Sequence, residues 1–329
     1  MSIFDPIRAA IDTAEKASQA ATDALLAANA TLTAENASLR AQIQAQRPTG
    51  TRFGVDLSNL TGDKPLTEKQ KVTAHRAAGL RLTNVRVFAG SSVPSWSDER
   101  VQALDPARGD SILVSTLSRD KAGLATWLRN TPDAWRGHVR LSHGHEREAD
   151  ILKSANPTAA LADWLAGCQE KADLLDAASS YGYSSDDFVK IMLWYSQVID
   201  PKTKGSQERF HGGQDFGMWG MDCYHNAAWL NVGDRYSTTQ ELFDPVITFA
   251  KHAGRPVCVP EWGSTLAKTD TGGTRRAQAI TDGGTYLKAA GVVFANWWCG
   301  TGSLDPTQPK GYRDFHLDGT PALAAYVAL

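Results

Sequence analysis

Residues 256–264 read PVCVPEWGS, a short apolar run that leads directly into a glutamate. A run of this length bounded by proline is consistent with a buried strand of a parallel sheet. Helical patterns over 239–253 and 277–290 lie on either side of it, and each ends at a glycine, Gly254 or Gly291. Glycine directly after a helical pattern is a common stop signal. The stretch therefore indicates one β-strand between two helices.

The same alternation continues outward from this stretch in both directions. Predicted strands cover 52–57, 85–88, 111–117, 138–142, 189–194, 218–224, 256–260 and 292–297. Predicted helices cover 67–78, 121–128, 158–178, 239–253 and 277–290, with weaker patterns at 98–104 and 321–327. Eight strands alternating with helices predict an α/β fold, a (β/α)₈ TIM barrel over residues 48–329. A doubly wound open sheet is the alternative, but no glycine-rich phosphate fingerprint follows the first strand.

Two glutamates stand just past predicted strands of this barrel, Glu146 after the fourth and Glu261 after the seventh. Barrel enzymes carry their chemistry at the C-terminal ends of the strands. Two carboxylates that flank one glycosidic bond can act as nucleophile and as acid/base, about 5–5.5 Å apart in retaining enzymes. We predict that Glu261 is the nucleophile and Glu146 the acid/base, with Arg86 as a cation that keeps the nucleophile ionised. The alternative is that both are structural carboxylates at the rim.

Three further carboxylates need an interpretation. Glu148 competes with Glu146 for the acid role, and we expect it to be a solvated loop charge. Asp222 is expected to point away from the cavity if Tyr224 points into it. Asp56 either lines the base of the site or closes a turn.

The stretch 200–215 exceeds a normal loop and forms either a substrate-binding lid or a contact surface.

The sequence His143-Gly144-His145 raises the question of a metal. An H-x-H pair marks some metal-dependent barrel hydrolases, in which the pair lies on the first strand and further His and Asp ligands follow. Here the first strand offers only Asp56, so we predict no metal and no other cofactor. His145 is expected to hydrogen-bond near the active site.

These motifs resemble the clan of retaining (β/α)₈ glycoside hydrolases. H-E at 145–146 is similar to family 26, the β-mannanase-like group, and P-E-W-G at 260–263 resembles its nucleophile motif. V-R-V-F at 85–88 and G-M-D-C-Y-H-N at 220–226 resemble its second and sixth strands. The resemblance implies a Tyr224 hydrogen bond to the nucleophile, supporting roles for His145 and Trp262, and Trp297 or Trp298 as a sugar platform. It does not name the glycan.

Residues 1–47 have a different composition, rich in Ala, Glu, Gln and Leu. The segment 5–46 carries a heptad pattern with d positions at Ile11, Ser18, Leu25, Leu32 and Leu39 and a positions at Thr22, Asn29, Asn36 and Ile43. Such a pattern is typical of a coiled coil, and Asn at a positions specifies register. We predict that 5–46 form a homo-oligomer, with a trimer favoured over a dimer. A lone amphipathic helix that packs on the barrel is the alternative.

Composition limits the partners. The formal net charge is −2, which argues against nucleic acid or an anionic membrane as partner. No apolar run is long enough to span a membrane, and the first ten residues lack the apolar core of a signal peptide, so synthesis in the cytoplasm is expected. The four Cys, at 168, 223, 258 and 299, have no CxxC spacing and are predicted to be buried thiols.

A coiled coil joined to a glycosidase-like barrel resembles phage tail or tail-tip proteins. That resemblance implies a location in a virion tail, a cell-surface or cell-wall polysaccharide as substrate, and other tail proteins as further partners. Two functions follow. The first is hydrolysis of a glycosidic bond with retention. The second is a non-catalytic carbohydrate-binding, receptor-binding or structural tail module on the same barrel.

Overall fold

The computed structural model describes residues 5–46, 50–56, 66–193, 210, 212–214, 216–225, 234–299, 315–317 and 321–329. The chain forms two compact units, Met1–Pro48 and Thr49–Leu329. The first unit contains one helix, and the second contains all of the described strands.

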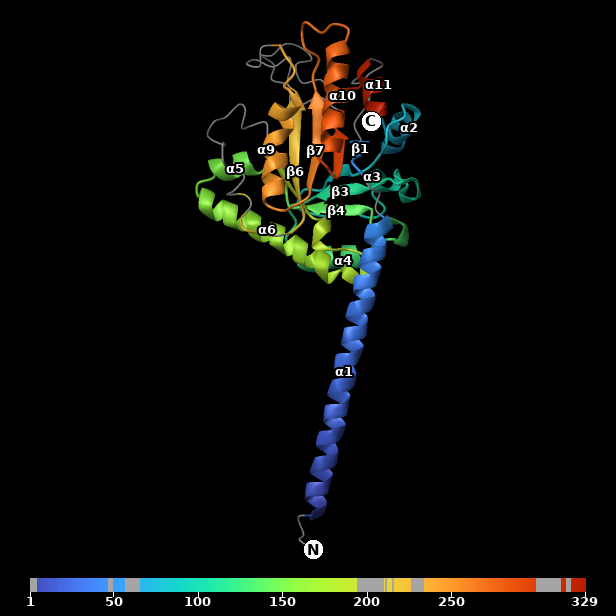
Figure 1. Cartoon of the computed structure of the whole chain (residues 1–329), viewed down its shortest axis with the longest axis vertical. Coiled ribbons are helices and arrows are strands. Elements are labelled where there is room, and N and C mark those ends of the chain that lie inside the picture. Colours follow the sequence, from blue (N-terminus) through green and yellow to red (C-terminus); the bar gives the residue numbers. More distant parts are fainter. Residues whose placement is uncertain are drawn as a thin grey trace. The chain divides into compact units, whose positions relative to one another are not determined.

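The second unit is a (β/α)₈ barrel, as predicted (Figure 1). Its strands are β1 (Arg52–Val55), β2 (Val85–Phe88), β3 (Ile112–Ser115), β4 (Val139–Ser142), β5 (Val189–Leu193), β6 (Met218–His225), β7 (Val257–Ser264) and β8 (Phe294–Trp297). Parallel ladders join them in the orders β1-β8-β7-β6-β5 and β2-β3-β4. Isolated bridges Leu141–Phe188 and His145–Ile191 connect β4 to β5.

The barrel closes between β1 and β2 without a ladder in the part of the chain that the structure describes. Instead, the Val55 N–H donates to the Arg81 carbonyl at 3.1 Å. Gly54 makes this approach possible, because a Cβ placed on it would lie 2.5 Å from the Thr83 carbonyl oxygen. The absence of a side chain at Gly54 therefore brings β1 against the segment that leads into β2.

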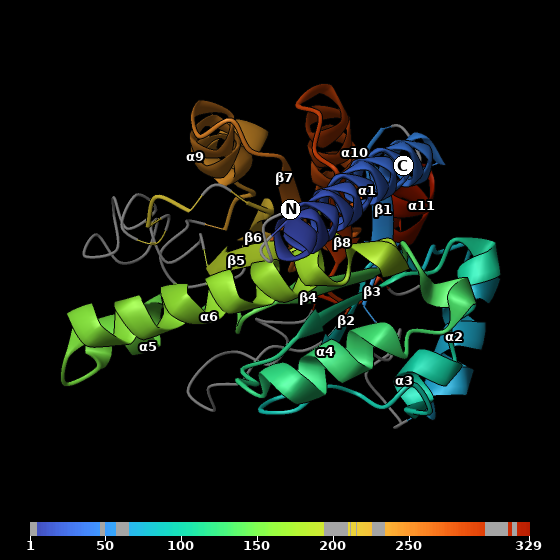
Figure 2. The same cartoon turned by 90° about the horizontal axis from the view of Figure 1, so that it is seen from below.

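Helices cover the outside of the strands (Figure 2). They are α2 (Glu68–Ala77), α3 (Glu99–Gln102), α4 (Lys121–Arg129), α5 (Glu148–Lys153), α6 (Pro157–Ala177), α9 (Thr239–His252), α10 (Thr274–Ala289) and α11 (Pro321–Val327). Capping boxes begin α2 at Thr67 and α9 at Thr238, where each hydroxyl accepts from the backbone three residues on. Helix α5, which directly follows Glu146, was not predicted from the sequence.

Two apolar layers follow from the alternation of side chains along the strands. A small cluster lies inside the barrel and consists of Leu113, Val189, Ile191, Met218, Cys258 and Phe294. The larger cluster lies between strands and helices and includes Val87, Val114 and Trp262. Arg140 lies over the Phe294 ring at 5.4 Å, so β4 turns a charged residue toward the inner layer.

Strand β7 departs from simple alternation. Gly220 pairs with Cys258, but Asp222 pairs with Glu261, so three residues of β7 match two of β6. This extra residue is a β-bulge, which re-aims the side chains that follow it. Pro260 lies in the bulge, where its missing N–H removes no ladder bond. As a result Glu261, rather than Pro260, shares the inward face with Cys258.

The first unit consists of α1 (Asp5–Gln46), whose 42 residues span about 63 Å at 1.5 Å per residue. Leu25 is 72% exposed and Leu26 63% exposed in the single chain. Exposed leucines agree with the heptad pattern, but they do not establish a coiled coil, so oligomerisation stays a prediction.

Two other predictions concern the whole chain. All four cysteines are buried and free, as predicted. Among the described residues, no helix combines the length and apolar character that a membrane span requires.

Candidate active site

Glu146 follows β4 in a tight backbone turn. Its φ is +52°, in the left-handed region that residues other than glycine seldom adopt, and Gly144 before it has a φ of +60°. The Ser142 hydroxyl donates to the Gly144 carbonyl at 3.1 Å, which holds the turn. An unfavourable backbone conformation kept by its surroundings is common at functional sites. Here it brings Glu146 to the C-terminal end of the barrel.

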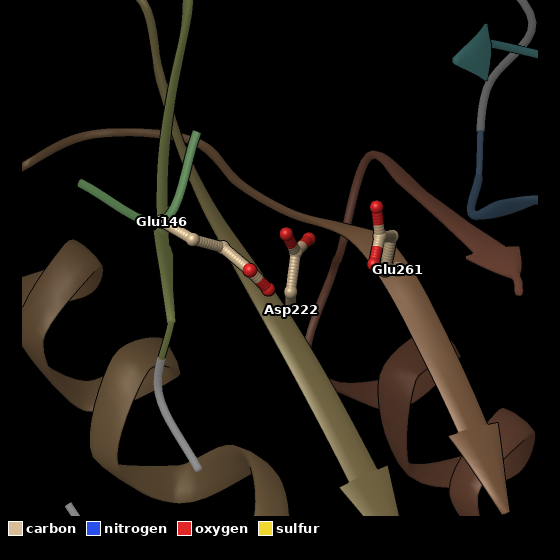
Figure 3. Close-up of side chains that lie close together, drawn as sticks. All are labelled: Glu146, Asp222 and Glu261. Carbon is tan, nitrogen blue, oxygen red and sulfur yellow. The ribbon is translucent and has the colours of Figure 1, made fainter. Parts of the chain in front are cut away.

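Glu261 lies across from Glu146, on β7 (Figure 3). Its side chain forms an ion pair with Arg86 of β2, with Nη1 and Oε1 3.0 Å apart. The Tyr224 hydroxyl of β6 donates a short hydrogen bond to Glu261 Oε2. Glu261 is 6% exposed. The ion pair and the donated hydrogen bond hold the Glu261 carboxyl in one orientation, as a nucleophile requires.

The third carboxylate of the site, Asp222, was assigned the wrong direction from the sequence. Asp222 and Tyr224 are two residues apart on a regular strand, so they share one face. Asp222 is fully buried, and Arg86 Nη1 lies 3.4 Å from its Oδ1. The period of two along 218–225 is the signal that would have placed it inside.

Glu146, Asp222 and Glu261 each present an oxygen atom, and these three atoms lie within 4.8 Å of one another. This separation matches the close spacing of retaining glycosidases and is shorter than the roughly 6.5–9.5 Å of inverting ones. The group could also offer oxygens to a cation. However, the Arg86 guanidinium already contacts two of the three carboxylates, which opposes a metal ion at the same place.

Burial and charge give the carboxyls different acidities. Burial, assisted by the Glu261 charge, raises the pKa of Glu146 to about 8. The same two causes raise the pKa of Asp222 well above its ordinary value. Although burial opposes it, the negative charges of Glu261 and Asp222 raise the pKa of Arg86, so the guanidinium stays charged. A carboxyl with a raised pKa beside a charged guanidinium is suited to act as a general acid.

His145 immediately precedes Glu146 and contacts β2 and β3. Its Nδ1 is 3.1 Å from the Ser115 hydroxyl, and its ring lies 4.7 Å from that of Phe88. Burial and the Arg86 charge lower the pKa of His145 to about 3, so the imidazole is neutral. Phe88, which the sequence reading did not single out, is 45% exposed at the end of β2.

Among the predicted sugar platforms, Trp298 keeps a suitable position. It is partly exposed, and its ring lies 5.6 Å from that of Tyr224, edge to face. Asp56 follows β1, and its Oδ1 accepts from the N–H of Cys299, just after β8, at 2.7 Å. The contact joins the ends of these neighbouring strands and does not close a local turn.

Three further sequence predictions were wrong. Trp262 and Trp297 have no exposed surface, and they lie in the layer between strands and helices with their rings 5.3 Å apart. The bulge in β7 explains Trp262, because turning Glu261 inward turns its neighbour outward. Trp297 is one residue past the inward-facing Asn296, so it faces outward too. Glu148 is 3% exposed and begins α5, so it is no solvated loop charge.

The stretch 200–215 lies mostly outside the described residues. Within it, Phe210 is buried against Trp164 of α6 with ring centroids 5.6 Å apart, and Gln214 accepts from Lys190 at 2.7 Å. These contacts do not decide between a lid and a contact surface.

Comparisons with known proteins agree with this fold. No protein-family model matches the chain, and no curated protein matches it in sequence. The exo-β-1,4-mannosidase Op5Man5 from Opitutaceae bacterium strain TAV5 is similar in structure, with a TM-score of 0.55 and 15% identity over 85% of this chain. This chain spans 59% of the length of that mannosidase.

The names of two further similar structures include glycoside hydrolase family 5 (GH5). A Bacteroidetes-affiliated GH5 cellulase linked with a polysaccharide utilization locus gives a TM-score of 0.54 at 15% identity, over 87% of this chain and 91% of that one. A GH5-4 broad specificity endoglucanase from an uncultured bacterium gives 0.50 at 13% identity, over 87% and 95%. The chain therefore shares the barrel fold of glycoside hydrolases, and at this identity the likeness concerns the fold alone.

Proposed function

We propose that the chain is a retaining glycoside hydrolase that cleaves a polysaccharide. The observation that carries the proposal is the juxtaposition of Glu146 with Glu261, the latter in contact with Arg86 and Tyr224. A pair of close carboxyls at the C-terminal end of a barrel suits this reaction. The non-catalytic alternative needs neither the close spacing nor the raised pKa of Glu146.

The first step forms a covalent intermediate. A carboxylate oxygen of Glu261 attacks the anomeric carbon, while Glu146 gives its proton to the glycosidic oxygen and that C–O bond breaks. In the second step Glu146, now ionised, takes a proton from water as the water oxygen attacks the anomeric carbon. The ester bond to Glu261 then breaks, and both carboxyls return to their starting states.

The names of the structural neighbours suggest which polysaccharides should be tested first as substrates. Their names include a β-1,4-mannosidase, a cellulase and an endoglucanase, so β-linked mannan and glucan come first, followed by bacterial cell-wall polysaccharides. Assignment to family 26 rests on short sequence motifs, above all His145-Glu146, whereas two of these neighbours carry the family 5 name. The coiled-coil oligomer belongs to the same proposal, and its test is given in the Discussion. A virion-tail role rests on architecture alone, and the comparisons lend it no support.

The test is release of reducing ends from this panel by wild type, Glu146→Gln and Glu261→Gln. We expect each substitution to lower kcat by at least about 10³-fold, because each removes a group that changes covalent or protonation state in the reaction. Glu148→Gln is the matched control, since this neighbouring buried carboxyl has no assigned role in the chemistry.

The stereochemistry of the first product gives a second readout. Proton NMR of the newly released sugar should show retention of the anomeric configuration, and inversion would contradict the proposed double displacement. If wild type cuts no polymer, but one polymer binds equally to wild type and both variants, the barrel is a carbohydrate-binding module.

A further inference from the structure

Asp222 has no part in the two-carboxylate reaction, yet it lies between the two reacting groups (Figure 3). It is fully buried on β6, the Arg86 guanidinium lies 3.4 Å from its Oδ1 and 3.5 Å from its Oδ2, and one of its oxygens lies within 4.8 Å of an oxygen of Glu146. Glu261, its ladder partner on β7, also contacts Arg86. A third carboxyl in such a place needs a physical explanation.

The charges around Asp222 do not balance if all three carboxyls ionise. Its charged neighbours from the surrounding strands are Arg86, Glu146 and Glu261, and the Tyr224 hydroxyl and the thiols of Cys223 and Cys258 lie nearby. Three carboxylates beside one guanidinium would leave two uncompensated negative charges. Isolated buried charge is very costly, so such sites retain protons instead. Two protons on the three carboxyls restore neutrality.

Glu261 has the strongest contacts to the positive charge. Its oxygen lies 3.0 Å from Arg86 Nη1, compared with 3.4 Å for Asp222, and it alone of the three accepts from Tyr224 among the described contacts. The two protons therefore belong on Glu146 and Asp222. Burial and the Glu261 charge, which raise the pKa of both groups, act in the same direction.

We propose that Asp222 is a positioning residue that stays protonated through the reaction and links Arg86 to the acid/base Glu146. This inference rests on the proposed glycosidase function. In the first step, formation of the ester removes the negative charge of Glu261, and loss of its proton places a negative charge on Glu146. The Asp222 O–H then donates to the Glu146 carboxylate, while its other oxygen faces Arg86. Asp222 keeps its own proton, so no atom or charge is left over.

Two variants test the role of Asp222 in activity. Asp222→Asn supplies a neutral N–H donor of the same shape, and we expect kcat/KM to fall by about two- to tenfold. In a plot of kcat/KM against pH, the alkaline limb, where activity falls as Glu146 loses its proton, should stay in place. Asp222→Leu removes the hydrogen bond, and we expect a loss of about 10- to 100-fold. If Asp222→Asn moves the alkaline limb down by a full pH unit or more, then Asp222 was ionised, and the proposal is wrong.

Infrared spectroscopy reads the proton without any substrate. A protonated carboxyl has a C=O stretching band that a carboxylate lacks, so at neutral pH subtracting Asp222→Asn from wild type should leave one such band. The exposed Asp163→Asn, on α6, is the control and should leave none. Glu146→Gln should keep one band, and its absence there would overturn the proposal even if the Asp222 variants did not fold. Failure of wild type to cut any glycan would refute only the glycosidase function.

Discussion

At the scale of single residues, the raised pKa of Glu146 has a cost in stability. A carboxyl whose pKa is about 8 when folded and near 4.5 when unfolded binds more protons in the folded state between these values. The free energy of unfolding therefore falls as pH rises from about 4.5 to about 8. Sites that hold groups ready for chemistry commonly reduce stability in this way.

Glu146→Gln should remove this cost. We expect its Tm to exceed that of wild type by about 2–5 °C at pH 8, and by less at pH 5, where the wild-type carboxyl keeps its proton. Thermal unfolding at several pH values measures the difference. Glu99→Gln, an exposed carboxyl on α3, is the control. A gain that did not vary with pH would show that burial does not raise the pKa of Glu146.

At the scale of elements, Gly54 holds β1 close to the chain before β2. A methyl group there would meet the Thr83 carbonyl and hydroxyl oxygens at 2.5 Å and Asn296 Oδ1 at 2.8 Å. The Thr83 carbonyl belongs to the backbone and cannot rotate away, so β1 would have to move.

Gly54→Ala should therefore lower the free energy of unfolding by about 1–3 kcal/mol, the usual cost of overpacking. Gly272→Ala is the matched control, because the nearest atom to its added Cβ lies 3.8 Å away. Denaturant unfolding of both variants compares them. Equal midpoints would mean that the barrel closes in some other way than by the approach at Gly54.

The elements also explain how far the sequence could predict this molecule. The strands and longer helices were predicted because each apolar run has its own period, and because three of the helices are followed by a glycine, Gly79, Gly254 or Gly291. Glu146, Glu261 and Arg86 were found because strand ends converge in a barrel. Trp262 was misplaced because its role came from the resemblance at 260–263, although alternation beside the inward-facing Glu261 already turns it outward. The bulge itself was not predictable, because it is a property of two paired strands, and β7 alone does not reveal its partner's register. Asp222, in contrast, was predictable from alternation within β6.

At the scale of the whole molecule, α1 is a long helix on which Leu25 and Leu26 are exposed in the single chain. Burying leucine side chains against another copy would stabilise an oligomer by about 1.5–3 kcal/mol for each side chain. The heptad pattern places Leu25 at a d position, in the seam, and Leu26 beside it.

Leu25→Glu should therefore dissociate the oligomer much more than Leu26→Glu does. The two residues are adjacent and similarly exposed, at 72% and 63%, so the comparison isolates the heptad position. Sedimentation at micromolar concentration measures it. Full-length wild type that sediments as a monomer would refute the coiled coil, and equal effects of the two substitutions would refute this register.

The four buried cysteines allow unfolding of the barrel unit to be followed by chemical labelling of their thiols. Cys168 lies in α6, Cys223 in β6, Cys258 in β7 and Cys299 just after β8, and none has exposed surface. Burial also raises the pKa of Cys168 to about 12, so its reactive thiolate is scarce. A thiol-specific label can reach these sulfurs only through local or global unfolding. The order in which they become labelled would therefore map which sectors of the barrel separate first.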